Sequence, residues 1–198
     1  MNNATIFGKV VTSPEYSHRV YGESFFNLTL EIPRLTEGVS DMVPVTFSEC
    51  LFEYQINVGD YIGIEGQVRT YNKFDEKEGK KKLFVTVFAK NVIYGVCETC
   101  NIVEFEGFLC KKPNYRITPF GREIADLHIA VNRQFSGFSD YIPCITWGRN
   151  ASFCERLEVG AKLEIIGRFQ SRVYGKVIDG IKIPKTTYEI SVKTLYVK

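Results

Sequence analysis

The chain has 198 residues, of which 44% are hydrophobic and 24% are charged, and its formal net charge is +2. These values are typical of a soluble globular protein, and the length suits one large domain or two of about 100 residues. The N-terminus has no basic segment followed by an apolar run, and no apolar stretch approaches the ~18 residues of a membrane span. We therefore expect a cytoplasmic protein with no membrane contact.

The first half of the chain is predicted to consist mainly of strands. In FFNLTLEIPR, residues 25–34, hydrophobic and polar side chains alternate, which is typical of a strand with one buried face. Farther along, KFDEKEGKKKL (73–83) mixes charges of both signs around Gly79. We expect a solvated hairpin tip there.

Six cysteines are distributed along the chain, and without a secretory signal they are expected to be free thiols. Cys144 and Cys154 lie in apolar runs and are predicted to be small core residues. The motif CETC (97–100) supplies only half of a usual zinc site. We interpret it as part of a solvated linker, with metal or thiol chemistry as the alternative, and we expect no cofactor.

The second half repeats the strand pattern and adds a helix. IADLHIAVNR (124–133) alternates like its counterpart, and further strands are expected at 103–110, 141–147, 162–170 and 187–195. The segment 150–160 begins with Asn150 as a possible N-cap and ends at Gly160, which predicts about two helical turns. The aromatic residues expected in the core are Phe26, Phe105, Phe153 and Phe169.

The chain contains an internal repeat with a period of about 100 residues. Six residues recur 99 positions later, namely Gly8, Pro14, Gly22, Gly38, Asp41 and Pro44. We therefore expect two units, a first copy (residues 1–95) and a second copy (residues 103–198), joined by a linker (96–102). Three strands, a short helix and two strands is the order of an OB-fold. The predicted fold is all-β, with two tandem OB-folds.

Four segments of the second copy, GREIADLHIAVNR, YIPCITWGRN, VGAKLEIIGRFQSR and YEISVKTL, resemble in their order and spacing the bacterial single-stranded DNA-binding (SSB) proteins. The resemblance covers residues 103–197 and extends more weakly over 4–93. It implies that single-stranded DNA wraps over the barrel and that its bases stack on aromatic side chains. The implied stacking residues are Phe135, Tyr141, Trp147 and Tyr174 in the second copy and Phe47 in the first. Burial in the core is the competing interpretation for each of them.

The two copies differ in charge. Residues 1–99 carry ten basic and thirteen acidic side chains, a net charge of −3, whereas residues 100–198 carry fifteen and ten, a net charge of +5. Because cations neutralise phosphates, the second copy is expected to make the stronger DNA contact. Its candidate phosphate partners are Arg116, Arg122, Arg133, Arg149, Arg168, Arg172 and Lys176.

The sequence contains no motif that indicates catalysis, since no glycine-rich phosphate loop and no nucleophilic triad can be found. The resemblance to SSB proteins implies instead a protein that binds single-stranded DNA without sequence preference and protects it in replication, recombination or repair. SSB proteins typically carry one OB-fold per chain and form tetramers, so the resemblance implies a homodimer with four OB-folds. The alternative function is an accessory protein of replication restart or of a mobile element, in which one copy binds DNA and the other binds a protein.

Overall fold

The computed structural model describes residues 1–75, 79–134, 136–178 and 181–198. The first copy contains β1 (Asn2–Val10), β2 (Glu15–Val20), β3 (Glu23–Pro33), β4 (Ser40–Ser48), the short 3₁₀ helix η1 (Glu49–Leu51), β5 (Tyr61–Asp75) and β6 (Lys80–Tyr94). The second copy contains β7 (Cys100–Leu109), β8 (Asn114–Ile117), β9 (Glu123–Asn132), β10 (Ser139–Trp147), α1 (Arg149–Cys154), β11 (Lys162–Ile178) and β12 (Ile181–Val197). Because β7 begins at Cys100, the last three residues of the predicted linker lie in a strand.

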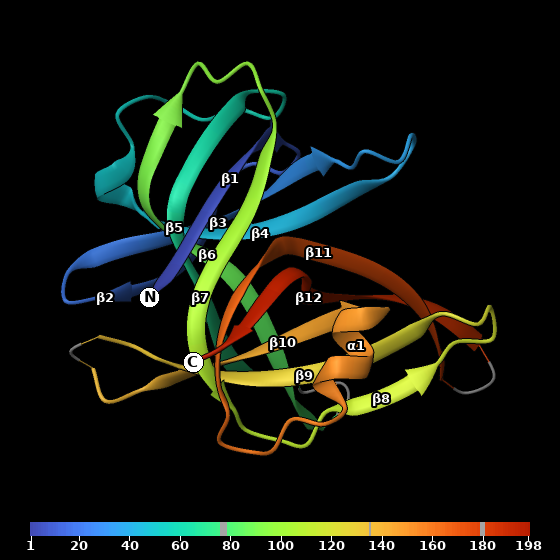
Figure 1. The fold of residues 1–198 in the computed structure, drawn as a ribbon. Helices are drawn as coiled ribbons and strands as arrows, with labels where there is room; N and C mark the ends of the chain where they lie inside the picture. Colours follow the sequence, from blue (N-terminus) through green and yellow to red (C-terminus); the bar gives the residue numbers. More distant parts are fainter. Residues whose placement is uncertain (76–78, 135, 179–180) are drawn as a thin grey trace.

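The strands form two barrels that share one continuous hydrogen-bonded sheet. Its order is β2-β3-β4-β6-β5-β1-β7-β11-β12-β10-β9-β8, which is symmetric about the antiparallel pair β1–β7. Pairings of β1 with β3 and of β7 with β9 close each barrel. The last strands, β6 and β12, pair antiparallel with β5 and β11 and parallel with β4 and β10. Figure 1 shows the two barrels one above the other, with β1 and β7 crossing between them. The prediction of two tandem OB-folds is confirmed.

Alternation of side chains determines which face of each strand is buried. In β3 the hydrophobic residues Leu28, Leu30 and Ile32 are buried between half-buried polar ones, as the period of two predicts. Phe105, Phe169, Cys144 and Cys154 lie in the core, as expected, while Phe26 packs against it half-buried. The prediction that Phe153 lies in the core is wrong, because this side chain lies on the outer side of α1 with 47% of its surface exposed.

Barrel closure requires glycine where one strand crosses another at close range. A Cβ atom on Gly8 would lie 2.6 Å from the carbonyl oxygen of Glu31, and one on Gly107 would lie 2.6 Å from that of Ala130. These two glycines are 99 residues apart and occupy equivalent positions in β1 and β7. The repeat therefore preserves the residue type that lets each barrel close.

The helix is shorter than predicted. It covers residues 149–154, its N-cap is Gly148, and Asn150 lies inside the helix, where its side chain donates to the carbonyl of Lys193. Only Ala151 and Cys154 are buried. The amides of Arg156 and Leu157 bond three residues back, so the chain tightens into turns after the helix. The first copy has only η1 at this place.

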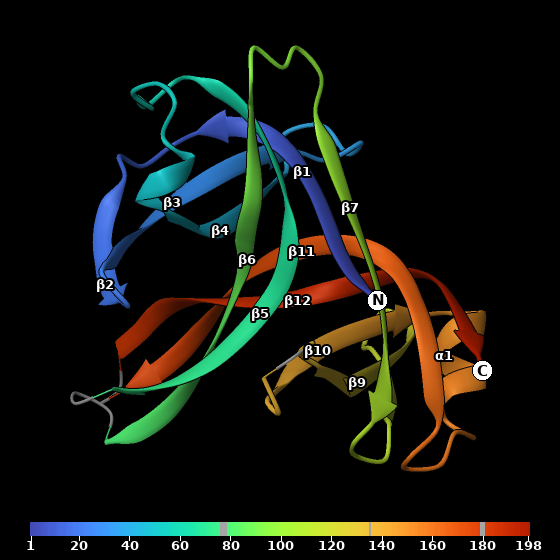
Figure 2. The ribbon, with the colours of Figure 1, turned by 90° about the vertical axis from the view of Figure 1, so that its left-hand side faces the viewer.

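Two long hairpins extend beyond the barrels. β5–β6 and β11–β12 project toward the same side of the molecule, and each passes beside the other copy (Figure 2). The predicted hairpin tip at residues 73–83 coincides with the end of β5–β6, although residues 76–78 lie outside the described part. Within the described residues, no helix is long and apolar enough to cross a membrane.

Candidate functional site

The outer face of the second barrel brings together side chains from five strands. In β10 Tyr141, Pro143 and Trp147 point outward, and cross-strand pairing places Pro143 beside the half-buried His128 of β9. On this face Tyr141 is 52% exposed and Trp147 is 40% exposed, and Tyr174, in the part of β11 that extends beyond the barrel, is 43% exposed. Three of the four aromatic residues predicted for stacking in the second copy are therefore open to solvent. The fourth, Phe135, lies outside the described residues.

Cations line the same face, but two of them already have partners. Arg116 forms an ion pair with Asp126 at 2.8 Å, and Arg172 lies 3.7 Å from Glu189. Their guanidinium groups remain about half exposed, so a phosphate could compete with these carboxylates. The neighbouring ring of His128 has a lowered pKa because it is partly buried and lies near Lys111.

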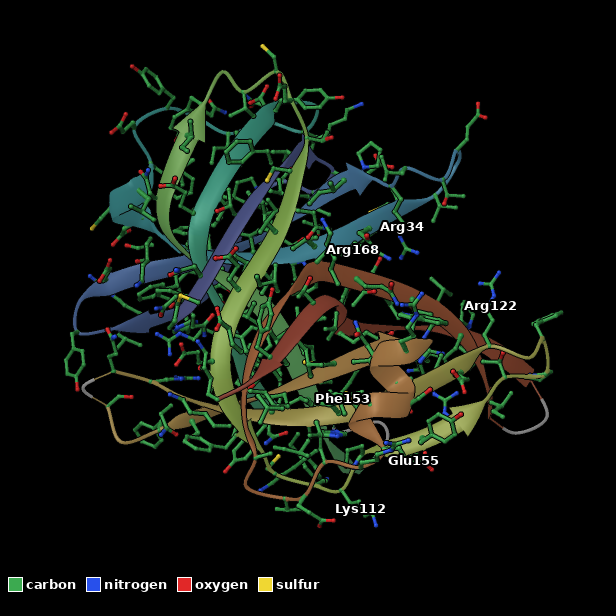
Figure 3. All side chains as sticks on the ribbon, viewed as in Figure 1. Arg34, Lys112, Arg122, Phe153, Glu155 and Arg168 are labelled. Carbon is green, nitrogen blue, oxygen red and sulfur yellow. The ribbon has the colours of Figure 1, made fainter. Side chains whose placement is uncertain are left out.

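Arg149 and Arg122 are the predicted cations that keep exposed side chains without a partner in the described part of the chain. Arg149 begins α1, two residues after Trp147. Arg122 lies in the loop between β8 and β9 and points away from the body of the protein (Figure 3). The side chain of Lys176, another predicted phosphate partner, lies outside the described residues.

A carboxylate braces the structure around Trp147. Glu123 accepts hydrogen bonds from the Tyr115 hydroxyl and the Ser152 hydroxyl, each at 2.8 Å, and its own carbonyl accepts from the amide of Gly148. These contacts join β8, the start of β9 and α1. The hydroxyl donors, Tyr115 first, lower the pKa of Glu123, so near neutral pH the carboxylate is charged and holds β8 and α1 against the start of β9.

Two of the predicted phosphate partners have a different role. Arg133 binds the buried Asp140 through two hydrogen bonds of 2.7 and 2.9 Å and also donates to the carbonyl of Thr70, in the other copy. Arg168 pairs with the buried Asp41 of the first copy. Figure 3 shows Arg168 with Arg34 at the border between the copies. In the structure both guanidinium groups hold the two copies together, and the phosphate contacts predicted for them stay predictions.

The border between the copies has approximate twofold symmetry. Asp140 accepts from the amide of Thr70, and Asp41 accepts from the amide of Ser171, which is the equivalent residue. Asn2 and Asn101, 99 residues apart, each form two hydrogen bonds with the backbone of the long hairpin of their own copy. The copies therefore have one defined arrangement, which fixes how their outer faces are related.

The prediction that Phe47 stacks on bases is corrected, because this side chain is 1% exposed and packs in the first core against Phe52 and Phe26. The error is one of register. In the structure Ser48 pairs with Phe25 as Trp147 pairs with Ile124, so Ser48 is the equivalent of Trp147. A shift by one residue moves a side chain to the opposite face of a strand.

The first copy has its own outward aromatic residues, most of which the sequence reasoning missed. Phe25 stacks on His18 with ring centroids 4.9 Å apart, and Phe88 lies 5.8 Å from Phe25. Tyr71 stacks on Phe84, with ring centroids 5.2 Å apart. In the first copy these outward aromatic residues lie on β3, β5 and β6 rather than on β4. Alternation in the segment 84–88 could have revealed it, because Phe84 and Phe88 share one face.

The cysteine motif is not part of this surface. Cys97 is exposed in the connection between the copies, and Cys100 begins β7. Among the described residues, no group of three or more histidine, cysteine or acidic side chains could hold a metal ion.

Comparison with known proteins agrees with this architecture. The model of the single-strand binding protein family matches residues 1–94 and 100–197. Single-stranded DNA-binding protein A of Bacillus subtilis (strain 168) is 39% identical over 80 residues, which are 37% of this chain and 46% of that protein. Protein B of the same organism is 34% identical over 83 residues, covering 37% and 71%. The chain spans about half the length of most curated relatives it matches.

Solved structures share the fold. The wild-type single-stranded DNA binding protein from Thermus aquaticus superposes with a TM-score of 0.78, and the match covers 100% of this chain and 93% of that one. A deletion mutant of the same protein gives 0.81, with coverage of 100% and 94%. Both are 20% identical in sequence, so this likeness concerns the fold alone.

Proposed function

We propose that this chain, which belongs to the single-strand binding protein family, binds single-stranded DNA without sequence preference and thereby protects it in replication, recombination or repair. It acts in the cytoplasm at the nucleoid, as a binding protein without catalysis. The observation that carries the proposal is the outer face of the second copy, where Tyr141, Trp147 and Tyr174 are exposed among cations.

Binding on this face would combine two sequence-independent contacts. Each base that stacks on an aromatic ring contributes roughly 1–3 kcal/mol, since every base has a π-face. Arg149 and Arg122, which are exposed and unpaired in the described part of the chain, and Arg116 and Arg172 would neutralise phosphates. Each phosphate contact steepens the salt dependence of binding.

Trp147 is the single tryptophan of the chain, so its fluorescence reports directly on this face. We would titrate the protein with oligo-dT, duplex DNA and RNA at low and moderate salt. Strong quenching by oligo-dT that weakens with salt is expected. Arg149→Ala should weaken binding and reduce the salt dependence by about one phosphate contact. If oligo-dT caused no quenching and did not bind, the proposal would be refuted.

We further propose a homodimer, which would bring four OB-folds together. The outer face of the six central strands, from β6 to β12 through β1 and β7, exposes Tyr61, Ile102, Phe108 and Tyr196. Its charges include pairs of both signs, Lys162–Glu106 at 3.2 Å and Lys198–Glu164 at 2.5 Å. The ion pairs lie among these apolar side chains, since Glu106 is between Ile102 and Phe108 on β7 and Glu164 pairs with Tyr196. A face that mixes exposed apolar and paired charged side chains suits contact with another protein surface, and a second copy of the chain is the partner we propose.

Light scattering tests the homodimer. We expect a mass of about 45 kDa, twice the 22.6 kDa of the chain, and a monomer after Ile102→Lys, because this change puts a charge into the centre of the contact. A monomeric wild-type protein would exclude the homodimer. The alternative of one DNA-binding and one protein-binding copy is not favoured, because both copies match the same family.

A further inference from the structure

The hairpin β8–β9 carries an exposed aromatic ring at its tip, at the outer edge of the second barrel (Figure 1). Phe120 is 92% exposed, and Ile117 at the end of β8 is 63% exposed. Because so little of either side chain is buried, neither adds much to the stability of the barrel. Tyr21, the equivalent of Phe120 99 residues earlier, is also fully exposed. Both copies therefore have a tip ring that the fold itself does not require.

The turn that carries Phe120 has a defined conformation. The amide of Thr118 donates to the carbonyl of Arg122 at 2.8 Å, and the carbonyl of Thr118 accepts from the amide of Gly121 at 2.8 Å. The Thr118 hydroxyl also accepts from the amide of Arg122 at 3.0 Å. Gly121 has a φ of 73°, in the left-handed region that favours glycine. With Glu123 joining the base of the hairpin to α1, the ring is held out from a braced support.

The tip of β8–β9 adjoins the face around Trp147. Ile124 pairs with Trp147 of β10 on one side and with Arg116 of β8 on the other. Phe120 comes four residues before Ile124, so at about 3.3 Å per residue the tip extends roughly 10 Å beyond this row. That length corresponds to about three nucleotides spaced by 3.4 Å. A strand that stacks on Trp147 and leaves the barrel on this side therefore passes the ring.

The two tips differ in charge. Arg122, directly after the turn glycine, is exposed, has no partner for its guanidinium group among the described residues and points away from the protein (Figure 3). Its equivalent in the first copy is Glu23, whose carboxylate accepts from the Ser48 hydroxyl. Arg19, near the first tip, donates to the carbonyl of Gly22 at 3.0 Å. The second tip thus combines its ring with an available cation, whereas the first combines its ring with a carboxylate.

A flat ring beside a cation, where a single strand leaves the barrel, suits the end of a duplex. At the point where a single strand joins a duplex, the last base pair exposes a flat surface larger than one base, bordered by the phosphates of two strands. An aromatic side chain can stack on that surface, and a cation can neutralise one of the phosphates. A protein partner fits less well, because one ring and one isoleucine offer far less area than a stable protein interface needs.

We propose that the tip of β8–β9 binds the junction between single-stranded and double-stranded DNA. Phe120 stacks on the terminal base pair of the duplex, and Arg122 contacts a phosphate beside it. This inference rests on the proposed function, because the single strand of the junction occupies the face around Trp147. The chain therefore binds a single strand most tightly where that strand meets a duplex.

The test compares one single strand with and without a duplex beside it. The first substrate is labelled oligo-dT of about 15 nucleotides, near the upper site size of one OB-fold. The others carry the same oligo-dT as a 5′ or a 3′ tail on a hairpin duplex of about 10 base pairs, one turn of B-DNA. Phe120→Ala removes the ring, and Arg122→Glu introduces the residue found at the equivalent Glu23. Tyr21→Ala is the matched control, since it removes an equally exposed ring without an available cation.

The wild-type protein is expected to bind one of the tailed hairpins roughly 5- to 100-fold more tightly than oligo-dT alone. Phe120→Ala should lose most of this preference and keep wild-type affinity for oligo-dT, because the replaced ring is exposed and the fold does not depend on it. Arg122→Glu should weaken binding of the tailed hairpin more than that of oligo-dT. The Tyr21→Ala protein should match wild type with every substrate.

Three results would overturn the inference while leaving the proposed function intact. They are equal affinity of the wild-type protein for oligo-dT and both tailed hairpins, an undiminished preference in Phe120→Ala, and a loss in Tyr21→Ala as large as that in Phe120→Ala. In the second case the tip would be left to a protein partner. Failure of the wild-type protein to bind oligo-dT would instead refute the proposed function.

Discussion

Replacing Asp140 by asparagine tests how the two copies hold together. Asp140 is fully buried and accepts from the amide of Thr70 at 2.6 Å, from Arg133 at 2.7 and 2.9 Å and from Arg69 at 3.2 Å. Asparagine has the same shape but no charge, and its NH₂ group would face guanidinium donors. The substitution therefore leaves two cations at the border without their counter-charge.

The expected loss can be worked out from these contacts. Three of the hydrogen bonds come from guanidinium groups, and each such bond is worth roughly 1 kcal/mol more than a neutral one. Removing one partner of a buried ion pair costs about 3–5 kcal/mol. Because the Arg69 and Arg133 side chains are 23% and 30% exposed, water compensates part of the loss. We expect the free energy of unfolding to fall by about 3 kcal/mol.

Urea unfolding followed by circular dichroism provides the measurement, and the chain offers matched controls. Asp41→Asn removes the symmetric cluster and should cost a similar amount. Asp126→Asn breaks the exposed pair with Arg116 and should cost below about 1 kcal/mol. If Asp140→Asn cost no more than Asp126→Asn, the reasoning that the buried carboxylates hold the copies together would be refuted.

Three further predictions concern single residues. Phe47→Ala should lower the free energy of unfolding, measured in urea, by about 3–5 kcal/mol. Trp147→Ala should leave this free energy nearly unchanged and weaken DNA binding. A large loss of stability in Trp147→Ala with none in Phe47→Ala would contradict the assignment of Phe47 to the core and of Trp147 to the outer face. Because the pKa of Glu123 is lowered by folding, its stabilising contribution is complete above about pH 4.5 and is lost as the pH falls through the lowered value. The melting temperature of Glu123→Gln should therefore approach that of wild type in acid, and a constant difference would argue against this role. Gly66→Ala should cost about 1–3 kcal/mol, seen as a lower melting temperature, because the new methyl group would collide with the carbonyl of Phe88.

The sequence predicted the fold well because its determining signals are local or repeated. Alternation identified the strands, and the 99-residue offset identified two equivalent units. The lengths of β11 and β12 were underestimated, since their outer parts, such as Tyr174, extend beyond the barrel. Such an extension is supported by contacts with the other copy, and a pattern within one strand contains no information about them.

The site was predicted less completely, and the reasons differ from residue to residue. Phe47 was misassigned by one residue, although the 99-residue offset of the repeat already aligns Trp147 with Ser48. Arg133 was assigned to phosphate because its charge was counted without its partner. A signal was available, since Arg34 and Asp41 recur 99 residues later as Arg133 and Asp140. A repeated acid–base pair seven residues apart indicates a structural contact in both copies.

The pairing of β1 with β7 has a consequence for synthesis on the ribosome. The first copy can close its barrel before β7 exists, and until then the outer edge of β1 is an unpaired strand, to which another chain could add. At about 5–20 residues per second, β7 follows β6 within a few seconds. Only residues 95–99 connect these strands, so the chain's own β7 competes at high effective concentration. The short connection is therefore expected to limit the exchange of second halves between neighbouring nascent chains on one messenger RNA.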